Sequence, residues 1–377
     1  MSEILGIINF ESNAVEVSGL SDYRGIPSLS FMGRYRIIDF VLSNMSNSAI
    51  SNIHIHVRGN SRSISEHVGT GRHFNINSKR GSLHVFSNES EMKASAYHTD
   101  ISSMSQNLEF LSDADEQYVL IAPSYFVYSF DYNDLLAEHL KSNADISMLY
   151  KSTDNANEVC IGCDTLSYEK DGCNPDLRRV VSIGVNRGKH KNRSISLECY
   201  LMRKSLLLEL LKEAREISPF YWLKDIIREK VDELAINGVA LRHPVRCINS
   251  LESYYTTHMN LIDQSKSKAF FREDWPIFTR TSDSPPTLYN STARVKNSTI
   301  SNGSMIMGTV ENSIIGRNVV IEEGAVVRNS IILTRAHIAS GIELDRAIVD
   351  KRAKVFNAKN ICAAADDIIY IGRSETV

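Results

Sequence analysis

The chain has 377 residues, of which 42% are hydrophobic and 23% charged, values typical of a folded protein of two or three domains. Its net charge of −3 gives no reason to expect binding to nucleic acid or to an anionic membrane. No apolar run approaches the roughly 20 residues that a membrane-spanning helix needs. The first residues also lack the basic and apolar regions of a signal peptide, so we expect a cytoplasmic protein.

The chain opens with a short apolar run that leads into residues 6–20. Nucleotide-binding α/β domains usually carry a phosphate-binding loop at this place, rich in glycine so that backbone N–H groups can close around phosphates. Here no glycine occurs between Gly6 and Gly19. The stretch is therefore either a phosphate loop that has lost its function or a loop of another kind.

Strand-like and helix-like segments alternate through the first two-thirds of the chain. Short β-branched runs predict buried strands, and amphipathic stretches predict helices. The predicted strands are 51–57, 118–123 and 146–151, and the predicted helices are 132–145, 204–217 and 223–238. This alternation favours an α/β domain with an open, mostly parallel, Rossmann-like sheet.

A different pattern begins after residues 263–286, a stretch without periodicity that we expect to be a linker. The hydrophobic period becomes six, which predicts a parallel β-helix of hexapeptide repeats in 287–377 and leaves 1–262 as the first domain. One apolar row is Ile314, Val320, Val326, Ile332, Ile338 and Leu344, the adjacent row is Ile315, Ile321, Val327 and Leu333, and a row of small residues is Asn318, Gly324, Ser330 and Ala336.

The cysteines include one C-x-x-C pair, Cys160 and Cys163, with Cys173 ten residues further on. This spacing could belong to a zinc site. No second C-x-x-C and no nearby pair of histidines completes a tetrahedral set, so we expect reduced thiols and no metal site.

Five segments of the chain together resemble the bacterial ADP-glucose pyrophosphorylases (glucose-1-phosphate adenylyltransferases), and they occur in the order of that family. The resemblance implies a nucleotidyltransferase domain of the GT-A-like kind followed by a left-handed β-helix. The segments are GRYRIIDFVLSNMSNSAI (33–50), SFDYNDLLAEHLKSNADIS (129–147), LKDII (223–227), LESYYTTHMNLI (251–262) and MGTVENSIIGRNVVIEEGAVVRNSIIL (307–333).

The positions that grip the nucleotide and the metal in that family are altered in this chain. The resemblance places the family's glycine-rich, Arg-ending loop on residues 6–20 and its Lys before a Pro on Ile26. The family's first Mg²⁺-binding Asp falls on Ser124 or Tyr125, depending on a one-residue gap, and its second falls on Cys247. Neither place carries a carboxylate, so we expect no catalytic residues and no metal in this chain.

Other parts of the family's substrate site are partly retained. The Asp of its sugar-binding segment falls on Tyr221, whereas Lys224 and Asp225 match and are candidates for contact with a sugar phosphate or nucleotide. Gln106 and Asn107 match a family motif near the nucleotide that relays the state of an effector. The structural alternative for this pair is a polar helix end.

Two arginines are candidates for an effector site. The resemblance places Arg24 and Arg36 in an anionic-effector pocket between the two domains, and a guanidinium group binds phosphate or sulfate well. The alternative is a structural Arg paired with a carboxylate such as Asp39. The family's Lys next to Arg24 is here Tyr23.

These changes have one chemical meaning. Adenylyl transfer joins two anionic reactants and depends on Mg²⁺, basic groups and N–H donors to neutralise their charge. The chain therefore resembles the GlgD-type companion subunits, which we expect to assemble with a catalytic subunit, as a heterotetramer, in glycogen synthesis. The expectation includes a phosphorylated or anionic effector, Mg²⁺ only in the catalytic partner, and no nucleic-acid or membrane partner. The alternative is an active but altered sugar-phosphate nucleotidyltransferase that holds its metal with other carboxylates such as Asp131.

Overall fold

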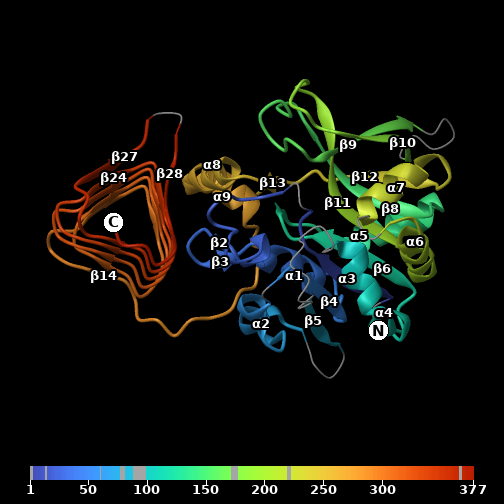
Figure 1. The fold of residues 1–377 in the computed structure, drawn as a ribbon, viewed down its shortest axis with the longest axis horizontal. Coiled ribbons are helices and arrows are strands. Elements are labelled where there is room, and N and C mark those ends of the chain that lie inside the picture. The colour runs from blue at the N-terminus through green and yellow to red at the C-terminus, as the bar shows by residue number, and fades with distance from the viewer. Residues whose placement is uncertain are drawn as a thin grey trace.

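The computed structural model describes residues 3–12, 15–59, 61–76, 81–87, 99–170, 177–218, 222–364 and 367–377. Figure 1 shows an α/β domain and, beside it, a β-helix built from the C-terminal part of the chain. None of the helices in these ranges is long and apolar enough to cross a lipid bilayer.

A nine-stranded sheet forms the centre of the α/β domain. Its strands, in chain order, are β1 (Ile4–Asn9), β4 (Ile53–Val57), β5 (Leu83–Ser87), β6 (Tyr118–Pro123), β8 (Ile146–Thr153), β9 (Asp164–Lys170), β10 (Arg178–Val185), β11 (Arg193–Arg203) and β12 (Ile236–Ala240). Their spatial order is β5-β4-β1-β6-β11-β8-β12-β10-β9. The pairs among β5, β4, β1 and β6 and the pair β8–β12 are parallel, as the sequence predicts, whereas β9, β10 and β11 pair antiparallel with their neighbours.

Alternating side chains place the sheet between two apolar layers. Ile4 and Ile8 of β1 belong to one buried cluster, and Leu5 and Ile7 belong to the other. This period of two is that of a strand with both faces buried, which is why the predicted strands read as continuous apolar runs.

Helices cover both faces of the sheet (Figure 1). They are α1 (Ile38–Asn47), α2 (Arg62–Val68), α3 (Asp100–Gln106), α4 (Leu108–Ser112), α5 (Tyr132–Ser142), α6 (Lys204–Ile217), α7 (Leu223–Glu229), α8 (Leu251–Ile262) and α9 (Gln264–Phe270). Helix α9 lies within the stretch expected to be a linker, and its Phe270 is buried in the core of the α/β domain.

The prediction of one helix over 223–238 is wrong. Helix α7 ends at Glu229, and after a short 3₁₀ turn (Lys230–Asp232) the chain enters strand β12. Ile236, Asn237 and Gly238 pair in parallel with β8. The backbone hydrogen bonds and burial that the sheet offers to Ile236 outweigh the helical pattern of its neighbourhood.

The C-terminal domain is a left-handed β-helix with three parallel five-stranded sheets, as the repeats predict. The first sheet contains β14 (Leu288–Tyr289), β17 (Met305–Ile306), β20 (Val320–Ile321), β23 (His337–Ile338) and β26 (Lys354–Val355). The second contains β15 (Arg294–Lys296), β18 (Thr309–Glu311), β21 (Val326–Arg328), β24 (Glu343–Asp345) and β27 (Asn360–Cys362). The third contains β16 (Thr299–Ile300), β19 (Ile314–Ile315), β22 (Ile331–Ile332), β25 (Ala347–Val349) and β28 (Ile369–Ile371).

The inward row of the β-helix changes register within the repeats. Ile315 pairs with Ile332, 17 positions later, so this coil is one residue shorter than three hexapeptides. The interior therefore holds Ile315, Ile321 and Val327 in one coil. In the next coil, which begins one residue earlier than a strict period of six would place it, the interior holds Ile332, Ile338 and Leu344. Ile314, Val320 and Val326 share the period-six row of Ile332, Ile338 and Leu344 but lie outside this interior, because a shift of one residue moves a side chain to the other face of a strand.

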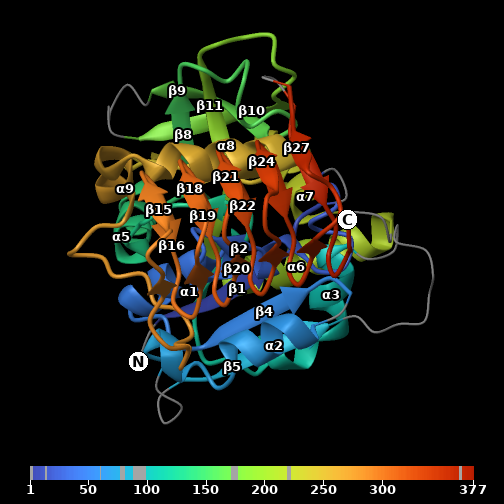
Figure 2. The same ribbon diagram turned by 90° about the vertical axis from the view of Figure 1, so that its left-hand side faces the viewer.

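The third sheet of the β-helix packs against the α/β domain (Figure 1), and Figure 2 shows the coils of the β-helix in front of that domain. Ile314, Ile331 and Ile348 are buried in the same cluster as the core residues of the α/β domain. Arg24 forms a buried ion pair of 2.7 Å with Asp350 across this boundary, and Asp350 also accepts a hydrogen bond of 3.0 Å from the Tyr370 hydroxyl. Apolar contacts and a buried ion pair thus join the two domains.

Candidate functional site

The two family metal positions lie side by side in the structure. Strand β7 (Phe126–Val127) pairs with β13 (Arg246–Cys247) so that Cys247 is opposite Phe126. The Ile248 N–H donates a hydrogen bond of 2.9 Å to the Tyr125 carbonyl. The fold therefore brings together two positions, far apart in the chain, that the resemblance associates with the metal.

These positions do not fit Mg²⁺. Both Tyr125 and Cys247 are buried, and the Ser124 hydroxyl donates to the Asn9 carbonyl at 3.2 Å. Magnesium requires hard oxygen ligands in an octahedron, usually carboxylates, and neither a phenol nor a thiol replaces them. Burial, together with the charge of the nearby Glu198, raises the pKa of Tyr125 well above its ordinary value, so this phenol stays neutral.

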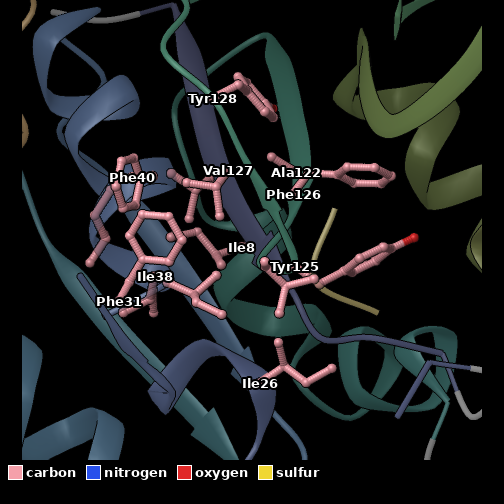
Figure 3. Close-up of a cluster of buried hydrophobic side chains, with 14 of the residues drawn as sticks. Ile8, Ile26, Phe31, Ile38, Phe40, Ala122, Tyr125, Phe126, Val127 and Tyr128 are labelled. Atoms are coloured by element: carbon pink, nitrogen blue, oxygen red, sulfur yellow. The ribbon is translucent and has the colours of Figure 1, made fainter. Parts of the chain in front are cut away.

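An apolar cluster surrounds Tyr125. Figure 3 shows Ile8, Ile26 and Tyr125 among its side chains, and all three are at most 1% exposed. Ile26, at the position of the family's Lys, thus belongs to the hydrophobic core. No charged group at this position is available to a phosphate.

Lys224, the retained cation of the sugar-binding segment, is paired with a carboxylate of the chain itself. Its Nζ lies 3.3 Å from Glu198 Oε1 and 3.3 Å from Ser12 Oγ, and both side chains of the ion pair are mostly buried. Burial alone would lower the pKa of Lys224, but the carboxylates of Glu198 and Asp164 outweigh it and raise that pKa. The cation is thus charged and already neutralised.

Glu198 adopts an unusual backbone conformation. Its φ is 50°, in the left-handed region, and it lies where the register between β11 and β8 shifts. Such a conformation costs a residue other than glycine of order 1 kcal/mol or more. The Glu198 carboxylate at this irregularity is directed at Lys224.

Further carboxylates of the site are also paired within the chain. Arg228 donates to Asp164 at 2.6 Å and to Asp225 at 3.3 Å. Burial, followed by the charge of Glu198, raises the pKa of Asp164 to about 6. Asp100 accepts from Asn9 Nδ2 at 2.8 Å, and burial raises its pKa to about 6.

The opening loop packs against its surroundings. Glu11 is buried, and its Oε1 accepts a hydrogen bond of 3.4 Å from the Ile26 N–H, a backbone donor of the type that phosphate loops use. Burial raises the pKa of Glu11. At the far end of the loop, Gly19 has a φ of 78°, and a Cβ atom there would overlap the Tyr370 ring of the β-helix. The loop therefore contributes a contact between the domains.

The remaining candidates have structural partners or lie outside the described residues. Gln106 is exposed at the end of α3, and Asn107 Nδ2 donates to the Ser103 carbonyl, the arrangement of a polar helix end. Asp131 caps α5 by accepting from the Asn133 N–H at 2.9 Å. Tyr221 and Cys173 are not among the residues that the structure describes.

A basic cleft of about 500 Å³ lies between the two domains. It is lined by the β2–β3 hairpin (Ser30–Phe31 and Tyr35–Arg36), helix α2, the segment 280–283 and successive corners of the β-helix. Two carboxylates, Glu66 and Asp283, line it as well. The basic residues of the lining are Arg34, Arg36, Arg280, Arg317, Arg335, Lys351, Arg352 and Arg373.

The charges in this cleft repel one another. Burial and the neighbouring guanidinium groups of Arg24 and Arg36 lower the pKa of Lys351 to about 7. Burial also lowers the pKa of Arg36 to about 10. Within the described residues, the buried Arg317 Nε has no hydrogen-bond partner. Concentrated cations with free donors are what a multiply charged anion requires.

The two predicted effector arginines have different places in the cleft region. Arg36 lines the cleft, and its Nη1 donates to the Ser63 carbonyl and hydroxyl at 2.6 and 3.0 Å. Arg24 is not among the lining residues, since its guanidinium pairs with Asp350. The predicted structural partner of Arg36, Asp39, accepts from the Arg36 backbone N–H at 2.8 Å and lies 2.5 Å from His67.

Sequence reasoning missed the cations of the β-helix. Arg317, Arg335 and Arg352 occupy the same corner on successive coils, and the Arg335 N–H donates to the Arg317 carbonyl at 2.9 Å. An alignment of the repeats by their strand pairing would have placed Arg335 and Arg352 in one column, and Arg317 and Lys351 in the adjacent column. Their shared direction toward the α/β domain could not be read from the sequence.

Fold and site together define a nucleotidyltransferase-type α/β domain joined to a hexapeptide β-helix. The nucleotidyl transferase family model matches residues 17–164, and the GlmU-like C-terminal hexapeptide model matches residues 287–367.

Comparison with known proteins identifies the family. The glycogen biosynthesis protein GlgD of Geobacillus stearothermophilus is 32% identical over 333 residues, which cover 86% of this chain and 83% of that protein. GlgD of Bacillus subtilis is 26% identical, with 98% and 96% covered. The glucose-1-phosphate adenylyltransferase of Fervidobacterium nodosum is 23% identical, with 93% and 83% covered. The chain belongs to the family that contains the GlgD proteins and the glucose-1-phosphate adenylyltransferases.

Proposed function

We propose that this chain is a regulatory, non-catalytic subunit of glucose-1-phosphate adenylyltransferase that supports ADP-glucose formation for glycogen biosynthesis. The reaction converts ATP and α-D-glucose 1-phosphate into ADP-glucose and diphosphate. The observation that carries the proposal is the pairing of Lys224 with the chain's own Glu198. A cation that is neutralised internally cannot offset the charge of two anionic reactants.

The altered metal positions support the same proposal. With Tyr125 and Cys247 in place of carboxylates, we infer that Mg²⁺ is held by the catalytic partner and not by this chain. Each loss of about 1.4 kcal/mol of transition-state stabilisation slows the reaction tenfold, and several such losses coincide here. The expected activity of the chain alone is accordingly very low.

The role that remains is assembly and control. We infer a heterotetramer with a catalytic subunit of the same fold, a partner suggested by the adenylyltransferases among the relatives. The basic cleft between the domains would take a phosphorylated or sulfate-like effector. Because the cleft joins the hairpin β2–β3 to the β-helix, a bound anion would change the coupling of the two domains.

The test compares the chain alone, the catalytic subunit alone and their mixture. We expect little turnover of ATP and glucose 1-phosphate by the chain alone, and a higher rate or an altered response to a sugar bisphosphate in the mixture. Arg335→Ala should weaken the effector response without changing the mass of the complex, whereas Arg294→Ala, outside the cleft, should leave both unchanged.

Two outcomes would contradict the proposal. If mixing changes neither rate nor effector response, the chain is not a subunit of this enzyme. If the chain alone matches the rate of a catalytic relative, it is an active but altered nucleotidyltransferase. In that case the metal ligand would be a residue other than Asp131, because the Asp131 side chain caps α5.

A further inference from the structure

Three cysteine thiols converge next to the degenerate site. Cys160 and Cys163 come from the loop between β8 and β9, and Cys247 comes from β13. Their sulfur atoms all lie within 4.8 Å of one another, and the Cys163 and Cys247 sulfurs are 3.6 Å apart. Cys163 and Cys247 are buried, whereas Cys160 is partly exposed.

We propose that Cys160, Cys163 and Cys247 form a binding site for a soft metal ion of the Zn²⁺ class. In a tetrahedral site with Zn–S bonds of about 2.3 Å, neighbouring sulfurs are about 3.8 Å apart, close to the separation of Cys163 and Cys247. Three thiolates select Zn²⁺ or another thiophilic ion over Mg²⁺. The partly exposed Cys160 leaves the fourth position to water or another small ligand.

The loop that carries the C-x-x-C pair is held in place before any metal binds. Cys160 has a φ of 54° and Gly162 a φ of 83°, so the turn between the two cysteines is tight. The buried Asn186 side-chain amide donates to the carbonyls of Ala156, Val159 and Cys160 at 2.8, 3.1 and 3.0 Å. Two backbone hydrogen bonds of 2.8 Å, from the Gly162 N–H to Asn186 and from the Asn186 N–H to Cys163, fix the same turn.

Asn249 supports the site from the other side. Its Nδ2 donates to the Ile161 carbonyl at 2.8 Å and lies 3.9 Å from the Cys163 sulfur. N–H groups directed at ligand sulfurs are typical of the outer shell of a metal site and orient its ligands. A bound ion would tie the β8–β9 loop to β13 and so stabilise the folded chain.

The test begins with metal binding by the full chain, reduced with a phosphine and freed of metal by a chelator. Titration with Zn²⁺ should give one ion per chain with a Kd below about 1 µM. Co²⁺ should give the near-ultraviolet charge-transfer bands of a thiolate complex. No uptake of either ion by the reduced chain would overturn the proposal.

Variants identify the ligands. Cys160→Ser, Cys163→Ser and Cys247→Ser should each weaken Zn²⁺ binding at least tenfold, whereas Cys199→Ser, which is buried elsewhere, and Cys362→Ser, which is exposed, should not. Zn²⁺ should raise the melting temperature of the unmodified chain but not that of Cys160→Ser. Unchanged affinity in the three trio variants would place the ion elsewhere and refute the site.

A measurement on the unmodified chain covers the case in which buried variants fail to fold. The partly exposed Cys160 should react with a maleimide in the metal-free chain and be protected by Zn²⁺, while Cys362 should react equally with and without the ion. Equal labelling of Cys160 in both states would contradict the proposal. These experiments need no catalytic partner, so their result is independent of the proposed regulatory function.

Discussion

At the scale of single residues, carboxylates of the chain itself contact a cation and a backbone donor in the region that corresponds to the family's substrate site. The Glu198 carboxylate pairs with Lys224, and Glu11 accepts from the Ile26 N–H in the loop where the family grips phosphate. Both donors therefore have an acceptor within the chain itself.

Glu198→Gln is expected to destabilise the fold and open the site. Loss of the carboxylate removes the ion-pair partner of the mostly buried Lys224, which costs about 3 kcal/mol of unfolding free energy. Urea unfolding measures this loss, and calorimetry with glucose 1-phosphate should detect tighter binding to the freed cation. Glu216→Gln, at an exposed position, is the control. Unchanged stability and unchanged binding would show that the ion pair has no such role.

Lys351 is expected to make anion binding in the cleft depend on pH. Its pKa of about 7 means that it is charged below that pH and neutral above it. A bound anion favours the charged form, so sulfate affinity should rise by roughly tenfold between about pH 8 and pH 6. His67 also lines the cleft, and burial lowers its pKa below the ordinary value.

Equilibrium dialysis with labelled sulfate checks this pH dependence, because sulfate itself does not titrate there. Lys351→Met should bind sulfate more weakly at the lower pH and with an affinity that no longer changes with pH. If the variant keeps the pH dependence of the unmodified chain, another group is responsible.

At the scale of elements, tertiary pairing corrected what local pattern suggested. The pattern of 223–238 is helical, yet its last part forms β12, because the parallel partner β8 offers backbone hydrogen bonds and burial that no local preference encodes. In the β-helix the sequence shows a period of six. The coil between Ile315 and Ile332 is one residue shorter than three such periods, and this moves the inward row by one position. Periodicity identifies such an element, and pairing fixes its register.

The register makes a prediction for two adjacent valines of β21. Val327 lies fully buried inside the β-helix, whereas Val326 is only partly buried. Val327→Thr should lower the unfolding free energy by about 1–3 kcal/mol, because a buried hydroxyl loses its water without a partner. Val326→Thr, the same change one residue away, should cost less than about 0.5 kcal/mol. Equal losses in thermal unfolding would contradict the assigned register.

At the scale of the whole molecule, the two domains act as one structural unit. They share a hydrophobic cluster, the Arg24–Asp350 ion pair and the contact of Gly19 with Tyr370. The basic cleft exists only at this boundary, since its cations come from both sides. Loss of domain contact would therefore abolish the cleft without touching any residue that lines it.

Asp350→Asn is expected to weaken this boundary strongly. The substitution leaves the buried Arg24 without its counter-charge and should cost about 3–5 kcal/mol of unfolding free energy. The double variant Arg24→Met/Asp350→Leu, which removes both charges, should regain most of that loss. Denaturant unfolding of the three chains measures it. A single variant as stable as the unmodified chain would show that the ion pair does not hold the domains together.

The sequence alone determined the class of the molecule. Alternating apolar runs predicted the α/β sheet, and a period of six predicted the β-helix. The family resemblance predicted substitutions at Ile26, at Ser124 or Tyr125, and at Cys247. These features are local, because a strand, a repeat or the replacement of a carboxylate is recognised from residues that are close together in the sequence.

Only the tertiary structure decided which distant residues meet. In the structure, Lys224 pairs with Glu198 and Arg24 pairs with Asp350. Arginines from successive coils line one cleft, and Cys247 lies next to the C-x-x-C pair. Each of these contacts joins segments far apart in the chain, and its geometry follows from sheet order, coil length and domain packing. Whether a charge is neutralised, or three ligands meet, depends on distances in space. The order of residues along the chain does not specify these distances.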